Sequence, residues 1–99
     1  MAYLRVMRFE EIRDLILPVL KKHGVSKAAI FGSFARNQER KGSDIDLLVE
    51  LRPGDGLLEF VGLKIELEEE LNCTVDLVEY EALKPALRER ILGEQVVLL

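Results

Sequence analysis

The chain has 99 residues, of which 48% are hydrophobic, and it is expected to form a single domain over residues 1–99 around one core. Its 14 basic and 18 acidic residues give a formal net charge of −4, which excludes a general electrostatic surface for nucleic acid, so we expect no direct nucleic-acid binding. No apolar run approaches the roughly 18 residues of a membrane span, and the first residues lack the layout of a signal peptide, so we expect no membrane contact and a cytoplasmic protein.

The first predicted element is an amphipathic helix within residues 9–24. Its apolar residues recur at helical spacing, acidic residues occupy its first turn and basic residues its last, and Gly24 is placed as the stop. Pro18 removes one backbone donor from the interior. The helix is therefore expected either to bend at Pro18 or to end at Leu17.

The remaining predicted elements alternate between strands and helices. They are strands over residues 25–31 and 44–51, a helix over 57–72, a strand over 74–80, a helix over 81–93 and a short strand over 95–99. This order predicts an α/β (α+β) fold with a mixed β-sheet. The helical crossover between the second and third strands makes that pair parallel, whereas the short link between the first two favours an antiparallel pair.

Two aspartates one residue apart, Asp44 and Asp46, interrupt the apolar strand 44–51. Because side chains alternate along a strand, both carboxylates share one face while their apolar neighbours point toward the helices. Asp76 alternates with apolar residues in the third strand in the same way, and it reaches the same face if the two strands are neighbours. Three carboxylates brought together repel one another unless a cation neutralises them, and their hard oxygen atoms favour Mg²⁺ or Mn²⁺.

Alternating aspartates are also typical of the solvated face of an antiparallel sheet, which explains the pair without any ligand. The preceding turn favours a binding site instead. Gly32 permits close backbone approach, Ser33 offers a hydroxyl and an amide, and Arg36 can neutralise a phosphate. The turn has neither P-loop nor dinucleotide-binding spacing, and the residues after Asp44 do not form an EF-hand loop.

The combined pattern is "GSFAR" from Gly32, a gap, "SDIDLLV" from Ser43, and a later lone Asp76 in a strand. It resembles the nucleotidyltransferase superfamily that includes DNA polymerase beta and the aminoglycoside nucleotidyltransferases, and within it the minimal nucleotidyltransferases. The likeness covers almost the whole chain. It implies a nucleotidyltransferase fold, with helices on one face of a mixed sheet and the active site on the other. It also implies two Mg²⁺ ions and transfer of a nucleoside monophosphate from ATP or another nucleoside triphosphate.

The resemblance assigns the site residues in two groups. The catalytic and metal-binding carboxylates are Asp44, Asp46 and Asp76. The nucleotide-binding residues are Gly32, Ser33, Arg36 and Ser43. Asn37 stands where the family pattern usually has glycine, and asparagine tolerates the left-handed conformation better than most other residues.

A chain of this size has little room for a separate acceptor site, so a partner is expected to complete it. Minimal nucleotidyltransferases of this kind resemble the antitoxin half of two-component systems whose other half is a helical HEPN toxin, a ribonuclease. The likeness implies adenylylation of a tyrosine on that toxin. Two rivals stay open: a non-catalytic antitoxin that neutralises its partner by covering it, and a small-molecule nucleotidyltransferase.

Two further features bear on acceptors and partners. Tyr3 and Tyr80 could accept in cis, although each is also explained by amphipathic packing. The apolar residues 96–99 are expected to pair as an edge strand, and any part left exposed would suit a partner or a second copy, so a homo-oligomer is possible.

Overall fold

The computed structural model describes residues 8–32 and 45–99. In order, the elements of this part of the chain are α1 (Phe9–Lys22), β1 (Lys27–Phe31), β2 (Ile45–Glu50), α3 (Leu57–Leu71), β3 (Val75–Glu79), the 3₁₀ helix η1 (Tyr80–Ala82), α4 (Pro85–Glu94) and β4 (Val96–Val97). The predicted order of helices and strands is confirmed. One boundary differs, because η1 and α4 replace the single helix expected over residues 81–93.

The four strands form one sheet in the order β3-β2-β1-β4. β1 pairs antiparallel with both β2 and β4, and β2 pairs parallel with β3. The parallel pair is the one that α3 connects, as the crossover argument predicts. The predicted mixed sheet is therefore confirmed, with β3 and β4 at its two edges.

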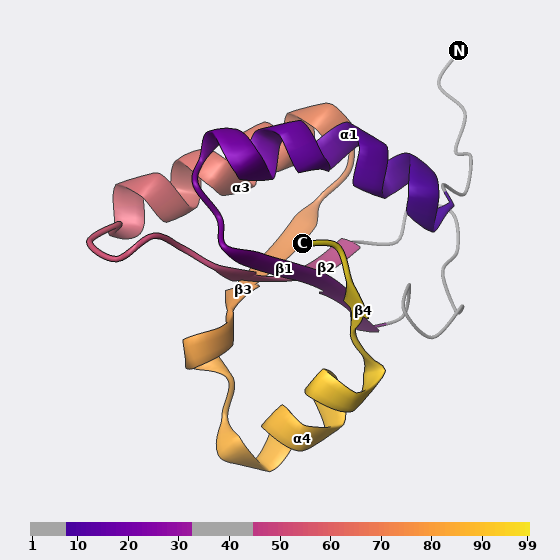
Figure 1. Cartoon of the computed structure of the whole chain (residues 1–99), viewed down its shortest axis with the longest axis vertical. Coiled ribbons are helices and arrows are strands. Elements are labelled where there is room, and N and C mark those ends of the chain that lie inside the picture. The colour runs from indigo at the N-terminus through magenta and orange to yellow at the C-terminus, as the bar shows by residue number, and fades with distance from the viewer. Residues whose placement is uncertain (1–7, 33–44) are drawn as a thin grey trace.

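Helices α1 and α3 lie side by side on one face of the sheet, whereas η1 and α4 lie on its other side (Figure 1). Between the helix pair and the sheet is the hydrophobic core, whose members come from alternate strand positions and from one stripe of each helix. Fully buried examples are Ile12, Ile16, Leu20, Ile30, Leu47, Leu63, Leu67 and Val75. The other face carries Asp46 and Asp76, and it also holds Ala29 and Leu48, which are fully buried.

The prolines fit their helices for different reasons. Pro18 lies inside α1, which continues to Lys22 because Val19 and Leu20 on the next turn are buried in the core. The alternative that the helix ends at Leu17 is therefore wrong. Pro85 is the first residue of α4, where its missing N–H is not needed. Among the described residues, no helix has both the length and the apolar character needed to cross a membrane.

Candidate active site

Asp46 and Asp76 occupy matching positions on the neighbouring parallel strands β2 and β3. Residues in register on adjacent strands point to the same face, and the strands are about 4.8 Å apart. The flanking residues Ile45 and Val75 are buried in the core beneath α1 and α3, so both carboxylates lie on the opposite face. Asp46 is half-buried, and Asp76 is exposed on the edge strand. The structure thus brings together two of the three predicted carboxylates.

Gly32 lies directly against Asp46. Its backbone has a φ of 75°, in the left-handed region that favours glycine, and its neighbour Phe31 pairs with Asp46 across β1 and β2. A Cβ atom at Gly32 would run into the Asp46 carboxylate. Glycine is therefore required at position 32 for two reasons: the left-handed backbone conformation, and the space that the Asp46 carboxylate occupies.

The other predicted site residues fall within 33–44 and lie outside the described residues. They are Ser33, Arg36, Ser43 and Asp44, and Asn37 belongs to the same segment. Their roles stay predictions.

The donor atoms that are present fit a hard divalent cation. Asp46 and Asp76 offer carboxylate oxygens, with no Cys or His beside them, which suits Mg²⁺ or Mn²⁺ better than zinc. Within residues 8–32 and 45–99, no three His, Cys, Asp or Glu side chains gather into a metal-binding group. A third carboxylate would have to come from elsewhere, and Asp44 is the predicted source.

Tyr80 contacts neighbouring elements through its ring and its hydroxyl, and it is not an exposed acceptor of a nucleotidyl group. Its hydroxyl donates to Oε1 of Gln95 over 2.9 Å, and the Lys27 ammonium lies 4.5 Å from the centre of its ring. Burial, and secondarily the charge of Glu50, raises the pKa of the Tyr80 hydroxyl. The structure therefore favours packing over acceptance in cis for Tyr80, while Tyr3 lies outside the described residues.

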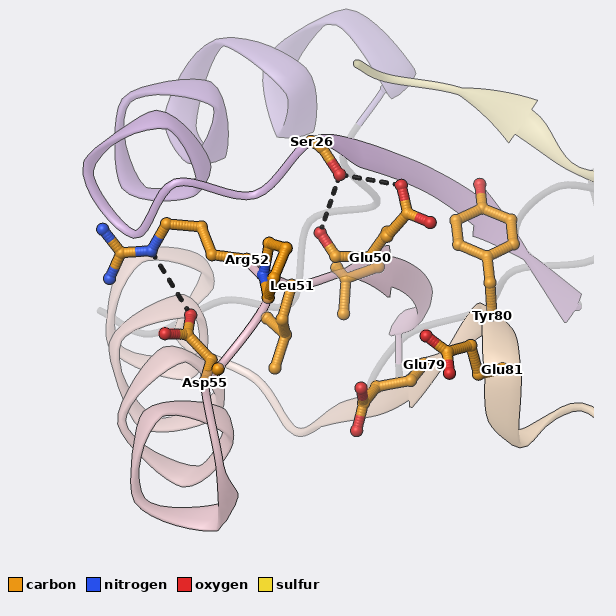
Figure 2. Close-up of a pocket in the computed structure, with 11 residues that line it drawn as sticks. Ser26, Glu50, Leu51, Arg52, Asp55, Glu79, Tyr80 and Glu81 are labelled. Carbon is orange, nitrogen blue, oxygen red and sulfur yellow. Dashed lines mark hydrogen bonds and ion pairs between the residues drawn. The ribbon is translucent and has the colours of Figure 1, made fainter.

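A cavity of about 540 Å³ lies at the far end of β2 and β3, away from every predicted site residue that the structure describes (Figure 2). Glu50 lines it four residues after Asp46, which is roughly 13 Å along the strand. Ser26 Oγ donates to Glu50 Oε1 over 2.8 Å, and Glu79 and Glu81 add further carboxylates. Neither Asp46 nor Asp76 lines the cavity, so it is separate from the aspartate pair. Its acidic lining also does not suit a triphosphate.

Residues 14–99 match the family described as Polymerase beta, Nucleotidyltransferase. The chain belongs to this family. It is a nucleotidyltransferase, a transferase that moves nucleotidyl groups. The resemblance drawn from the Gly-Ser turn and the aspartate pair is therefore confirmed.

Relatives of this nucleotidyltransferase carry the names of protein adenylyltransferases. A Methanocaldococcus jannaschii protein, provisionally given that name, is 50% identical over 93 residues, which are 94% of this chain and 100% of that protein. Protein adenylyltransferase MntA of Thermococcus cleftensis is 33% identical over 95 residues, covering 92% of this chain and 96% of that protein.

Solved structures share the fold. A structure described provisionally as a minimal nucleotidyltransferase superimposes with a TM-score of 0.78 at 39% identity, covering 88% of this chain and 89% of that one. A chain of a toxin–antitoxin crystal structure with AMP-PNP gives a TM-score of 0.76 at 21% identity, covering 88% and 72%. At 21% identity, the comparison with the toxin–antitoxin chain shows only that the two chains share a fold.

Proposed function

We propose that this nucleotidyltransferase is a protein adenylyltransferase that moves AMP from ATP to a hydroxyl of a partner protein. The observation that carries the proposal is the register of Asp46 and Asp76 on one face, with Gly32 against Asp46. This arrangement joins the start of the predicted triphosphate turn to a carboxylate pair. The names of the relatives support AMP as the transferred group and protein as the acceptor.

The chemistry is a displacement at the α-phosphorus. The acceptor oxygen forms a bond to that phosphorus, the bond to the bridging oxygen of pyrophosphate breaks, and pyrophosphate leaves with its electron pair. Asp76, exposed on the edge strand, takes the proton of the acceptor hydroxyl. Asp46 is held beside Gly32, the first residue of the predicted triphosphate turn. Together with Asp44, the pair would hold two Mg²⁺ ions, which when bound neutralise phosphate charge and align the reacting oxygens.

The position of Asp76 favours a large acceptor. Among the described strands β3 is at an edge of the sheet, so none of them covers the side of the carboxylate pair away from β2. A hydroxyl carried on the surface of another protein can approach there without entering a deep pocket. The described cavity lies at the other end of the strands and is acidic, so it offers no evident small-molecule acceptor site next to the carboxylates.

We further propose that the partner is a toxin of the HEPN type and that the acceptor is one of its tyrosines, so that the chain acts as an antitoxin. Support comes from the shared fold with a chain of solved toxin–antitoxin complexes. The rival is an antitoxin that only covers its toxin. An antitoxin that acts only by binding over its toxin has no need for two carboxylates in register on an open face, where they repel each other.

The test is to incubate the copurified pair with Mg²⁺ and each nucleoside triphosphate and to analyse the partner by mass spectrometry. We expect one or more tyrosines to gain AMP with ATP, and chelation of the metal to abolish the gain. Replacement of Mg²⁺ by Mn²⁺ should restore it. An unmodified partner, with nucleotide found only on RNA or on a small molecule, would refute the proposal.

A further inference from the structure

Helix α3 has a second apolar face that points away from the core. Its buried stripe contains Leu63, Leu67 and Leu71. Four other large apolar side chains of the same helix are exposed, namely Leu57 at 76%, Leu58 at 83%, Val61 at 40% and Ile65 at 51%. Their spacing of four residues, with Leu58 beside Leu57, gathers them on one side of the helix. Such a contiguous apolar surface is a candidate interaction site.

The exposed stripe is symmetric about its middle. Val61 lies four residues from both Leu57 and Ile65. When a second copy of α3 is laid antiparallel across the first, Leu57 and Leu58 of one copy therefore meet Ile65 of the other, and the two Val61 side chains meet at the axis. Gly62 lies next to this axis, and no atom comes within 4 Å of where its Cβ would be. The stripe thus meets the self-complementarity that a two-fold interface requires.

Charge favours the same antiparallel arrangement. The last turns of α3 are acidic and its last turn has no basic residue. Glu69 and Glu70 have no ion-pair partner among residues 8–32 and 45–99. The first turn of α3 is the positive end of the helix dipole, but it carries Glu59, and the Arg52 before it pairs with Asp55 over 3.5 Å. This end is therefore less acidic than the last turns, so antiparallel packing avoids the contact between two strongly acidic ends that parallel packing would create.

The apolar stripe supplies about half of the area that a specific dimer needs. At the usual apolar coefficient, full burial of a Leu, Val or Ile side chain removes roughly 60–120 Å² from water. With about 40–80% of each side chain exposed, two copies of the stripe bury on the order of 500 Å². A specific interface needs about 1,000 Å² in total, and the polar residues that flank the stripe must supply the rest. We therefore expect a dimer that dissociates on dilution.

We propose that α3 is the interface of a two-fold homodimer whose axis passes through the contact between the two Val61 side chains. The occupant is a second copy of this chain, because the stripe matches itself in spacing and in charge. The interface lies on the helix-covered side of the sheet, so both Asp46–Asp76 faces remain open to acceptors (Figure 1). The inference does not depend on the proposed function.

Sedimentation across a concentration series from micromolar to millimolar tests the proposal. The wild-type chain is expected to pass from monomer to dimer, and Leu58→Glu combined with Ile65→Glu should raise the dissociation constant at least tenfold. Both replaced side chains are more than half exposed, so circular dichroism should show an unchanged fold. Leu87→Glu is the matched control, since Leu87 is 45% exposed on α4, and it should dimerise like the wild type.

A cross-linking experiment tests the position of the axis. In a Cys73→Ala background, Val61→Cys should be joined to its own copy by a short thiol cross-linker, because the two-fold axis places these residues together. Leu87→Cys in the same background should not be joined. The proposal is overturned by a wild-type chain that stays monomeric at every concentration. It is also overturned by a dimer that persists in the Leu58/Ile65 double variant, or by cross-linking at position 87 but not at 61.

Discussion

At the scale of single residues, the contact between Gly32 and Asp46 links two parts of the candidate site. Strand alternation in the sequence correctly placed Asp46 and Asp76 on the face away from the core. It could not reveal the contact with Gly32, because that contact depends on the pairing of Phe31 with Asp46 across an antiparallel register. Register arises from the packing of whole strands, which no local pattern encodes.

Gly32→Ala is expected to lower both stability and transfer. A non-glycine residue in the left-handed region costs about 1–2 kcal/mol, and the added methyl group also displaces the Asp46 carboxylate. The melting temperature should therefore fall, and transfer should fall more steeply than the loss of folded protein explains. Thermal unfolding followed by circular dichroism, beside a transfer assay below the melting temperature, measures the two effects. Unchanged transfer would mean that this contact has no part in the chemistry.

Asp76→Asn should separate function from stability. The variant removes one of two like charges that face each other across β2 and β3, an interaction that destabilises by about 0.2–1 kcal/mol. We expect the free energy of unfolding in denaturant to stay equal or to rise by that amount, while transfer is lost. A clear loss of stability would instead reveal a structural role for the Asp76 carboxylate.

At the scale of elements, α4 is held by few contacts. It has no buried residue of its own, and it is tied to the sheet through Tyr80, whose hydroxyl bonds to Gln95 and whose carbonyl oxygen accepts from Arg88 Nη1 over 3.1 Å. The sequence predicted a single helix over residues 81–93. It did not predict the break at η1, after which Leu87 is exposed and Ile91 is only partly buried.

Tyr80→Phe tests that connection. The variant keeps the buried ring and its contact with the Lys27 ammonium but leaves the Gln95 oxygen without its donor, which costs about 1 kcal/mol. Hydrogen exchange should speed up across α4 and β4 while α1 and α3 stay protected. Modification of the partner protein should persist. Loss of that modification would restore Tyr80 as a candidate acceptor or site residue.

Helix α3 should confer sensitivity to acid. The Lys64 ammonium, then the Val75 N–H, lowers the pKa of Glu68, and Lys22, then His23, lowers that of Glu66. A carboxylate with a lowered pKa stabilises the fold fully above its unfolded value, near 4.5, and loses that contribution as pH falls through the folded value. The melting temperature should therefore drop below about pH 4.5. Glu68→Gln should flatten this drop, whereas exposed Glu89→Gln should leave it unchanged.

At the scale of the whole molecule, the fold follows closely from the sequence. Helical spacing, strand alternation and the lengths of the links were enough to predict the mixed sheet with its parallel and antiparallel pairs. The acidic cavity at the end of β2 and β3 did not follow from the sequence, since it is assembled from Ser26, the loop after β2 and η1. Those segments have no shared sequence pattern, so only the folded chain brings them together.

Catalysis of transfer to a bound protein is assigned to the Asp46–Asp76 face by the proposed function. The most direct measurement is the label transferred from ATP, labelled at its α-phosphate, to the copurified partner by the wild type, Asp46→Asn, Asp76→Asn and the control Glu81→Gln, with complex formation measured in parallel. All four should bind the partner, and only the two aspartate variants should fail to label it. Equal labelling by all four, or no labelling by the wild type while its complex forms and the toxin is silenced, would contradict the account.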